Sequence, residues 1–467
     1  MERTVTVVGQ VRDALGDLGF PLGWLSFPPA HGSLSSNISN TEIRATPLVI
    51  ARCHSVDDIV HVLMAAGQLS LPVAVRGGGY SPAGLGTVEG GIVADVSALD
   101  EIVVDPATRT VRVGAGVLSG DLEQALAAHG LAMTIPVPSR AGVVGAALSG
   151  GVGVLVRKLG YVSDAIIGAT VVTGLAEVEV VDERDVSGLF WGIKGGGGNF
   201  GIVAELEFRC VELPELATTQ LVFGEESLAA ALAFYRDWTV GLPEDITAVA
   251  MLRAVPAIPG VPEDRVGRPG LVLTVIHADP ARAAVDLTGL ADAPTAIFAH
   301  SFTGSPGELR VAMERGFPHD TFGAVIRSGW TDTIDDVGIA DIVELARAVP
   351  SRHSLIEVVR MGGAVRTMAD PGSAPGRDAE FLLNAMALWT EPDDASASRD
   401  WSARSAGVVH SVADSPALAP GFVSHDELDQ AATSYGAHYE RLRDLKTSFD
   451  PSNLLRRNLN IQPRSTQ

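Results

Sequence analysis

The sequence predicts an α+β protein built from two domains, and three observations lead to this prediction. A chain of 467 residues exceeds one compact core, because domains average about 150 residues. Three glycine-rich blocks, separated by short predicted helices and strands, lie within residues 1–213. From about Pro214 onward these blocks disappear, and alanine-rich helices alternate with apolar strands.

Local signals place the elements of the first domain. Ser55 precedes an apolar periodicity with two aspartates in its first turn, so we expect a helix that ends at Gly67. A second helix is expected over residues 121–128, with Ser119 as its cap. Apolar runs bounded by turn residues predict strands at 71–75, 91–95, 102–104, 111–113 and 166–173, the third and fourth forming a hairpin.

The second domain is expected to be of the α/β type. Helices are predicted over residues 226–238 and 342–348, and a buried strand over 270–275. Proline and glycine make 370–376 a surface loop. A long amphipathic helix is expected over 426–449, before the polar C-terminal tail.

Composition excludes several classes of partner. Lys and Arg number 34 against 56 Asp and Glu, which gives a net charge of −22 and a pI near 4.8. Such a surface repels phosphate backbones, so we expect neither a nucleic-acid nor a membrane partner. The two cysteines, Cys53 and Cys210, have no histidines at metal-ligand spacing, so no disulfide framework or metal site is expected.

The termini and hydropathy predict a cytoplasmic protein. Residues 1–7 carry mixed charge and lead into acidic positions, which is not typical of a signal peptide. No run approaches the roughly 20 apolar residues that span a bilayer. In the cytoplasm the sequon at Asn37, Ile38 and Ser39 would stay unused.

The first glycine block, residues 76–81, follows the predicted strand 71–75. Three consecutive glycines allow close backbone approach, so their N–H groups can form a cradle for a pyrophosphate. Arg76 stands beside them, where it can neutralise phosphate charge. Alone, such a triplet is equally typical of an ordinary turn.

Two further blocks strengthen the prediction of a nucleotide-type cofactor. Residues 134–153 place five glycines among small apolar residues, a pattern that can lie flat against a planar ligand. Residues 194–203 form a third glycine run that leads into a strand.

Together these blocks resemble the berberine-bridge-enzyme-like flavin oxidases of the vanillyl-alcohol-oxidase superfamily. The matching motifs are RGGGYSPAG from Arg76, SRAGVVGAALSGGVG from Ser139, WGIKGGGGNFGIV from Trp191 and the closing segment from Tyr439 to Pro463. The resemblance covers nearly the whole chain. It implies a PCMH-type FAD-binding module made of residues 1–213 and 428–467. Residues 214–427 would form an α/β substrate domain in which helices cover an antiparallel sheet.

The resemblance also implies which residues contact FAD. They are Arg76, Gly77, Gly78, Gly79, Tyr80, Ser81 and Gly84 in the first block; Ser139, Gly142, Val143, Gly145, Leu148, Gly150, Gly151 and Gly153 in the second; Gly201, Ile202 and Val203 in the third; and Asn458 and Asn460 in the tail.

Several departures from the family pattern bear on the chemistry. Tyr80 stands where the family has a histidine that bonds covalently to the flavin. The family's second, cysteinyl link falls near Val137 or Pro138, so FAD is expected to bind non-covalently. Residues 419–422 lack the family's tyrosine, and Ser149 replaces a glycine.

Two residues are candidates for acid–base or stacking roles. Tyr80, the candidate catalytic residue, would either stack on the flavin and act as an acid or simply fill the volume of the missing histidine. His425 would either be an acid–base group or flank a helix start; its acidic neighbours favour the second interpretation.

The leading hypothesis is an FAD-dependent oxidoreductase of the oxidase type. Its substrate is expected to be a small, polyketide- or terpenoid-like secondary metabolite, with protein groups supplying orientation. The alternative is a flavin-binding cyclase of the same fold that catalyses a non-redox, pericyclic-type ring closure, for which orientation alone lowers the barrier. A binding protein without catalysis is the third possibility.

Overall fold

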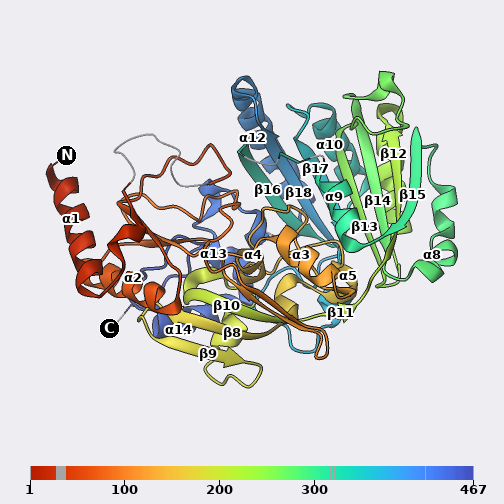
Figure 1. The fold of residues 1–467 in the computed structure, drawn as a ribbon. Coiled ribbons are helices and arrows are strands. Elements are labelled where there is room, and N and C mark those ends of the chain that lie inside the picture. Colours follow the sequence, from red (N-terminus) through yellow and green to blue (C-terminus); the bar gives the residue numbers. More distant parts are fainter. Residues whose placement is uncertain (1, 28–37, 316, 319–320, 416, 466–467) are drawn as a thin grey trace.

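The computed structural model describes residues 2–27, 38–315, 317–318, 321–415 and 417–465. Figure 1 shows the first half of the chain and the C-terminal segment on one side of the molecule, with a large sheet on the other. Asn37 of the sequon lies outside the described residues.

The N-terminal layer is a four-stranded sheet of order β1-β2-β4-β3, in which β2, β4 and β3 are parallel. Its strands are β1 Leu25–Ser26, β2 Val49–Arg52, β3 Val73–Arg76 and β4 Ile92–Asp95. Helices α1 Glu2–Asp17 and α2 Val56–Leu69 pack against it through one apolar cluster.

The predicted cap of α2 is confirmed, but its predicted end is wrong. The Ser55 side chain accepts a hydrogen bond from the Asp58 N–H, as an N-cap does. The helix continues through Gly67 to Leu69, because Ser70 takes the left-handed conformation, with φ of 54°, and ends it.

A second, five-stranded antiparallel sheet has the order β5-β6-β10-β8-β9. Its strands are β5 Ile102–Asp105, β6 Thr110–Gly114, β8 Ile166–Thr173, β9 Val178–Asp182 and β10 Gly201–Arg209. The predicted β5–β6 hairpin is confirmed. A short pair, β7 Leu131–Ala132 and β11 Val211–Glu212, lies beside it.

Helix α3, Ser119–Ala127, begins earlier than predicted. Leu118 occupies the N-cap position without a side-chain hydrogen bond, so the predicted capping by Ser119 is wrong. The Ser119 hydroxyl instead donates to the Ala141 carbonyl oxygen at 3.0 Å. This contact ties α3 to the second glycine block.

The third sheet has seven antiparallel strands in the order β15-β12-β14-β13-β17-β18-β16. They are β12 Leu216–Gly224, β13 Ile246–Ala254, β14 Pro269–His277, β15 Phe298–Gly304, β16 Gly323–Thr331, β17 Leu355–Arg360 and β18 Phe381–Trp389. Helices α7 Leu228–Trp238, α10 Asp336–Arg347 and α12 Ala395–Val412 cover one face (Figure 1). The opposite face turns toward the glycine blocks. The predicted α+β fold, with an antiparallel sheet covered by helices, is therefore confirmed.

Both predicted helices of this domain exist with shifted starts. Residues 225–227 form a 3₁₀ turn before α7, and α10 starts six residues earlier than predicted because Asp335 caps it. The remaining helices are α4 Val143–Leu148, α5 Val156–Leu159, α6 Leu189–Ile193, α8 Pro280–Asp286, α9 Pro306–Glu314 and α11 Ala364–Thr367.

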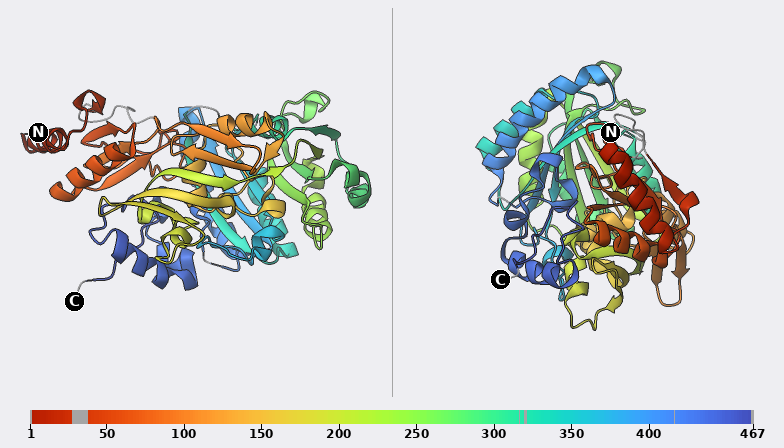
Figure 2. Two further views of the ribbon diagram at one scale, coloured as in Figure 1. Left: turned by 60° about the horizontal axis from the view of Figure 1, so that its bottom comes forward. Right: turned by 90° about the vertical axis from the view of Figure 1, so that its left-hand side faces the viewer.

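The predicted long helix over 426–449 is wrong. The structure has two helices, α13 Ala431–Tyr435 and α14 Tyr439–Phe449, separated by a turn that starts at Gly436. Gly436 has a φ of 50°, which a helix cannot continue through. Figure 2 shows the C-terminal segment packed beside the first half of the chain, so it returns to the glycine blocks after the seven-stranded sheet.

Candidate active site

A cavity of about 360 Å³ lies between the glycine blocks and the open face of the seven-stranded sheet. The sheet and its connections contribute mainly apolar side chains to the wall, among them Val249, Phe322, Ile326 and Leu388. The opposite wall is largely backbone. It is lined by the predicted residues Gly77, Gly78, Gly79, Tyr80, Ser81, Gly142, Gly145, Leu148, Gly151, Gly153, Gly201, Ile202, Val203 and Asn458.

The glycines of the first block permit backbone contact with the rest of the wall. A Cβ at Gly78 would lie 2.7 Å from the Arg140 carbonyl oxygen and 2.7 Å from the Gly142 nitrogen. A Cβ at Gly77 would lie 2.7 Å from the Ala115 carbonyl oxygen. In the triplet, positive φ is confined to Gly79, at 66°. Two of the three glycines are therefore required by close approach.

The backbone of this loop offers free donors. None of the N–H groups from Gly77 to Ser81 donates a hydrogen bond to any residue within the described part of the chain. Consecutive unpaired N–H groups at the wall of a cavity suit an anionic ligand such as a pyrophosphate. The residues present thus fit the phosphate part of a dinucleotide.

Arg76 has a different role from the one we expected. It does not line the cavity, and its guanidinium pairs with Asp95 at 2.7 Å, both side chains being buried. Burial alone would raise the pKa of Asp95, but the hydrogen bond and charge of Arg76 outweigh it and lower that pKa. The predicted neutralisation of phosphate by Arg76 is not what this geometry provides.

Arg457, which the sequence analysis did not select, supplies a cation to the cavity wall. Its guanidinium donates to the carbonyl oxygens of Thr87 at 3.0 Å and Ala83 at 3.3 Å. It therefore joins the C-terminal tail to the end of the first block. Burial lowers its pKa.

Five other predicted FAD contacts lie outside this cavity. Gly84 packs against Ile43, Val143 is in the core, and the Asn460 N–H donates to the Leu428 carbonyl oxygen. The Ser139 hydroxyl donates to Glu314 at 2.6 Å. Gly150, with φ of 90°, lines a small neighbouring cavity.

Tyr80 lines the cavity as part of an aromatic group. Its ring meets Phe322 edge to face at 5.5 Å and packs in a cluster with Phe317 and Phe422. Burial, followed by the nearby Glu314 charge, raises the pKa of the phenol, which is therefore neutral at physiological pH. These contacts favour the interpretation of Tyr80 as a wall residue.

His425 does not line the cavity, and its ring nitrogen lies 3.2 Å from the Arg457 guanidinium. Burial and that positive charge lower its pKa. Its neighbour Ser424 forms a capping box with Glu427, so the capping interpretation of this segment is confirmed.

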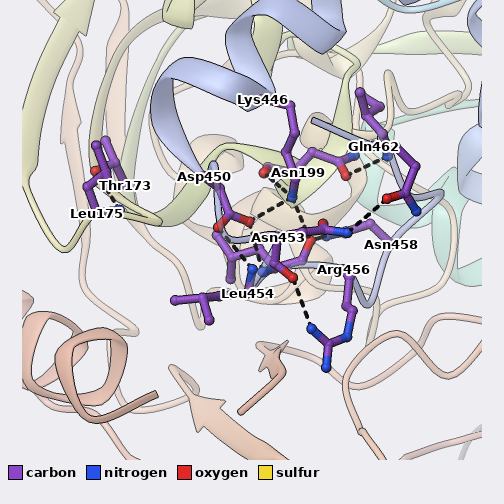
Figure 3. A network of polar contacts seen from close by, with 12 residues as sticks. Thr173, Leu175, Asn199, Lys446, Asp450, Asn453, Leu454, Arg456, Asn458 and Gln462 are labelled. Atoms are coloured by element: carbon purple, nitrogen blue, oxygen red, sulfur yellow. Dashed lines mark hydrogen bonds and ion pairs between the residues drawn. The ribbon is translucent and has the colours of Figure 1, made fainter. Parts of the chain in front are cut away.

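A buried ion pair holds the third block against the tail (Figure 3). The Lys446 ammonium donates to Asp450 at 2.7 Å and to the Asn199 carbonyl oxygen at 2.9 Å. The Asn199 amide in turn donates to the Leu459 carbonyl oxygen at 3.1 Å. Lys446 is fully buried and also donates to the Leu455 carbonyl oxygen, so it fixes the segment that carries Asn458 at the cavity wall.

Glu357 is a second cavity residue that the sequence analysis missed. It lies on β17, is half-buried at the cavity wall, and accepts a hydrogen bond from the Asn384 amide at 2.9 Å. Burial raises its pKa despite this hydrogen bond. The available signal was a single acidic residue with two apolar residues on either side of it.

Two family models match this chain at opposite ends. Residues 47–182 match an FAD binding domain, and residues 421–462 match the berberine and berberine-like family. The sequence is 29% identical over 439 residues to (R)-6-hydroxynicotine oxidase of Paenarthrobacter nicotinovorans, covering 89% of this chain and 91% of that protein. The chain therefore carries both an FAD-binding domain and a berberine-like domain, and over most of its length it is similar to FAD-linked oxidoreductases. It is accordingly an FAD-dependent oxidoreductase, and its FAD-binding fold is of the PCMH type.

Solved structures of berberine-bridge-enzyme-like proteins agree with this assignment. The 6-hydroxy-D-nicotine oxidase from Arthrobacter nicotinovorans superposes with a TM-score of 0.81 at 28% identity, covering 94% of this chain and 98% of that one. A Physcomitrella patens BBE-like 1 protein has a TM-score of 0.84 at 19% identity, over 98% of this chain and all of that one, which shows a common fold.

The described ranges of this FAD-linked oxidoreductase contain no helix long and apolar enough to cross a membrane. In the same ranges, no cluster of three or more His, Cys, Asp or Glu residues is arranged to hold a metal ion. The cytoplasmic location stays a prediction.

Proposed function

We propose that this oxidoreductase binds FAD non-covalently and oxidises a small, largely apolar metabolite. The observation that carries the proposal is the composition of the cavity: one wall of glycine backbone faces one wall of apolar side chains. Cofactor sites are typically apolar cavities with a few well-placed polar groups.

The non-covalent state is supported by the residues at the two linking positions. Tyr80, Val137 and Pro138 all line the cavity, and none has an imidazole or a thiol. Cys53 and Cys210 are buried elsewhere and do not line the cavity.

Several groups are placed to hold the cofactor. The free N–H groups of residues 77–81 and the Arg457 guanidinium would bind the pyrophosphate, while residues 142–153 and Asn458 would contact the ring systems. FAD, when bound, supplies the acceptor for a hydride from the substrate. The chain itself supplies orientation, exclusion of water and, through Glu357, one titratable carboxyl group at the cavity wall.

The apolar wall supports a carbon-rich substrate. Relatives named as a glucooligosaccharide oxidase, from Sarocladium strictum, and as a 6-hydroxynicotine oxidase act on very different molecules. Sugars require many polar partners, whereas Val249, Ile326 and Leu388 offer none. We therefore propose a polyketide- or terpenoid-like skeleton and a role in secondary metabolism.

The state of the flavin is tested by the visible spectrum of the purified protein before and after acid precipitation. We expect a yellow protein whose colour passes completely into the supernatant, because neither linking position carries an imidazole or a thiol and burial keeps the Tyr80 phenol protonated by raising its pKa. Colour that stays in the washed pellet would show that the flavin is covalently bound.

Redox turnover is tested by reducing the flavin with dithionite under anaerobic conditions in the presence of a turned-over substrate. We expect activity to stop and to return when oxygen is admitted. Product formation that continues with reduced flavin would favour the cyclase alternative instead.

A further inference from the structure

Glu357 and Asn384 face each other across two neighbouring strands beneath the cavity. In the register of β17 and β18 they are direct partners, and the Asn384 amide nitrogen donates to Glu357 Oε2 at 2.9 Å. The other carboxyl oxygen, Oε1, has no hydrogen bond to any residue that the structure describes. Because Glu357 lines the cavity, this oxygen is the polar atom that the sheet offers to a ligand.

The surroundings of this carboxyl group contain no compensating charge. Val249, Val359 and Met386 line the same cavity from three neighbouring strands, β13, β17 and β18. The other titratable lining residues, Tyr80 and Arg457, belong to the opposite wall, and neither forms an ion pair or hydrogen bond with Glu357 among the described residues.

Groups behind the sheet do not neutralise it either. Tyr235 lies on α7 and donates to the Ala248 and Val358 carbonyl oxygens. Its interaction with the Glu357 charge is electrostatic, without a hydrogen bond between the two side chains. Arg360, on the same strand, pairs with Glu380, and Arg157 donates to backbone carbonyl oxygens. Among the described residues, the carboxyl group is thus held in an apolar environment without a paired cation.

Asn384 adds a second unsatisfied acceptor. Its Oδ1 atom is buried and has no hydrogen-bond partner within the described ranges. A buried acceptor without a partner is costly and rare in native proteins. Asn384 itself does not line the cavity, so Glu357 Oε1, at the cavity wall, is the acceptor that a ligand with N–H groups would satisfy.

We propose that Glu357, held in place by Asn384, forms the subsite that binds a protonated amino group of the substrate. This inference rests on the proposed function and narrows it to an amine-bearing, largely apolar molecule. An ammonium group supplies several N–H donors and a positive charge, whereas an anion would be repelled and an ether has no donor. Asn384 acts as a positioning residue that holds the carboxyl group toward the cavity.

At any pH where the carboxyl group of the empty site is protonated, binding of an ammonium group should release a proton. Burial raises the pKa of Glu357, so the empty site holds a protonated carboxyl group over a wider pH range than free glutamate does. A bound cation favours the carboxylate and lowers that pKa again. Below the pKa of the empty site, amine affinity should therefore increase with pH, by about tenfold per pH unit at most.

The proposal is tested by calorimetry on the FAD-loaded protein under anaerobic conditions. The probes are N-methylbenzylamine and its neutral isostere benzyl methyl ether. We expect the amine to bind with proton release, measured in two buffers of different ionisation enthalpy. Glu357→Gln should lower amine affinity by about tenfold to a hundredfold and abolish the proton release, while ether binding changes little.

Two further variants separate the roles. Glu344→Gln, an exposed residue on α10 behind the same sheet, is the matched control and should bind the amine like the wild type. Asn384→Leu should weaken amine binding while proton release persists, because the carboxyl group remains but is no longer oriented.

Three results would overturn the proposal. The first two are equal binding of ether and amine by the wild type, and no binding of the amine by the wild type. The third is unchanged amine affinity and proton release in Glu357→Gln. A protein that purifies without flavin would refute the proposed function separately, since the flavin spectrum is recorded before any probe is added.

Discussion

At the scale of single residues, we expect Tyr80 to decide how the flavin is held. Its side chain lines the cavity directly after the glycine triplet, at the position of the linking histidine in the family that this chain resembles. We expect Tyr80→His to leave part of the flavin attached after acid precipitation, because the rest of the loop retains the family motif. The measurement is the flavin absorbance of the washed pellet.

Tyr80→Phe is the matched control for that substitution. It keeps the ring that packs edge to face on Phe322 and removes only the hydroxyl group. All flavin should then leave with the supernatant, as in the wild type. Complete release from Tyr80→His as well would mean that position 80 does not lie beside the reactive part of the flavin.

At the scale of the elements, the glycine blocks form the cavity wall through close backbone contacts. In Gly151→Val the new side chain would meet Val162 at 2.6 Å, at a φ of 80° that costs about 1–3 kcal/mol for other residues. In Gly78→Val it would meet the backbone of Arg140 and Gly142 at 2.7 Å. We expect both variants to lose FAD and to melt at lower temperature, measured by flavin content and calorimetry.

Gly90→Val is the control that distinguishes the effect of backbone strain on stability from the effect of a disrupted cavity wall on FAD binding. Gly90 also has a positive φ, of 63°, but a Cβ there would contact nothing within 4 Å and the residue does not line the cavity. This variant should lose stability and keep its flavin. Full flavin occupancy in the Gly78 and Gly151 variants would refute the assignment of these blocks to FAD.

At the scale of the whole molecule, Arg157 joins the glycine-rich half to the seven-stranded sheet. From α5 it donates to the carbonyl oxygens of Ile246 and Leu242, each at 2.7 Å, and to that of Met361. Burial lowers its pKa to about 10. Arg157→Lys should cost about 2–3 kcal/mol, because an ammonium cannot reach three divergent acceptors. Thermal unfolding monitored by circular dichroism measures the loss.

The neighbouring lysine provides the control for this contact. Lys158 pairs with Asp245 and is about a third exposed, so Lys158→Met should cost less than about 1 kcal/mol. Equal effects of the two substitutions would show that Arg157 has no special part in joining the two halves.

The sequence by itself determined the class of fold, the cofactor and most of the backbone wall of the cavity. Glycine spacing is a local property, and close backbone approach needs glycine wherever the chain folds back, so residues 77–81 and 142–153 could be identified without a structure. The α2 cap at Ser55 was equally predictable, because its partner is three residues away.

Only the tertiary structure decided which charged groups reach the cavity. Arg76 and Asp95 are register partners on adjacent parallel strands, so the Arg76 guanidinium pairs with a carboxylate 19 positions away in the sequence. The arginine that lines the cavity is Arg457. Glu357 lies at the cavity wall because the strand order places β17 between β13 and β18, in the part of the sheet that faces the cavity. Charge pairing depends on the register and order of strands, and these arise from long-range packing that no local pattern encodes.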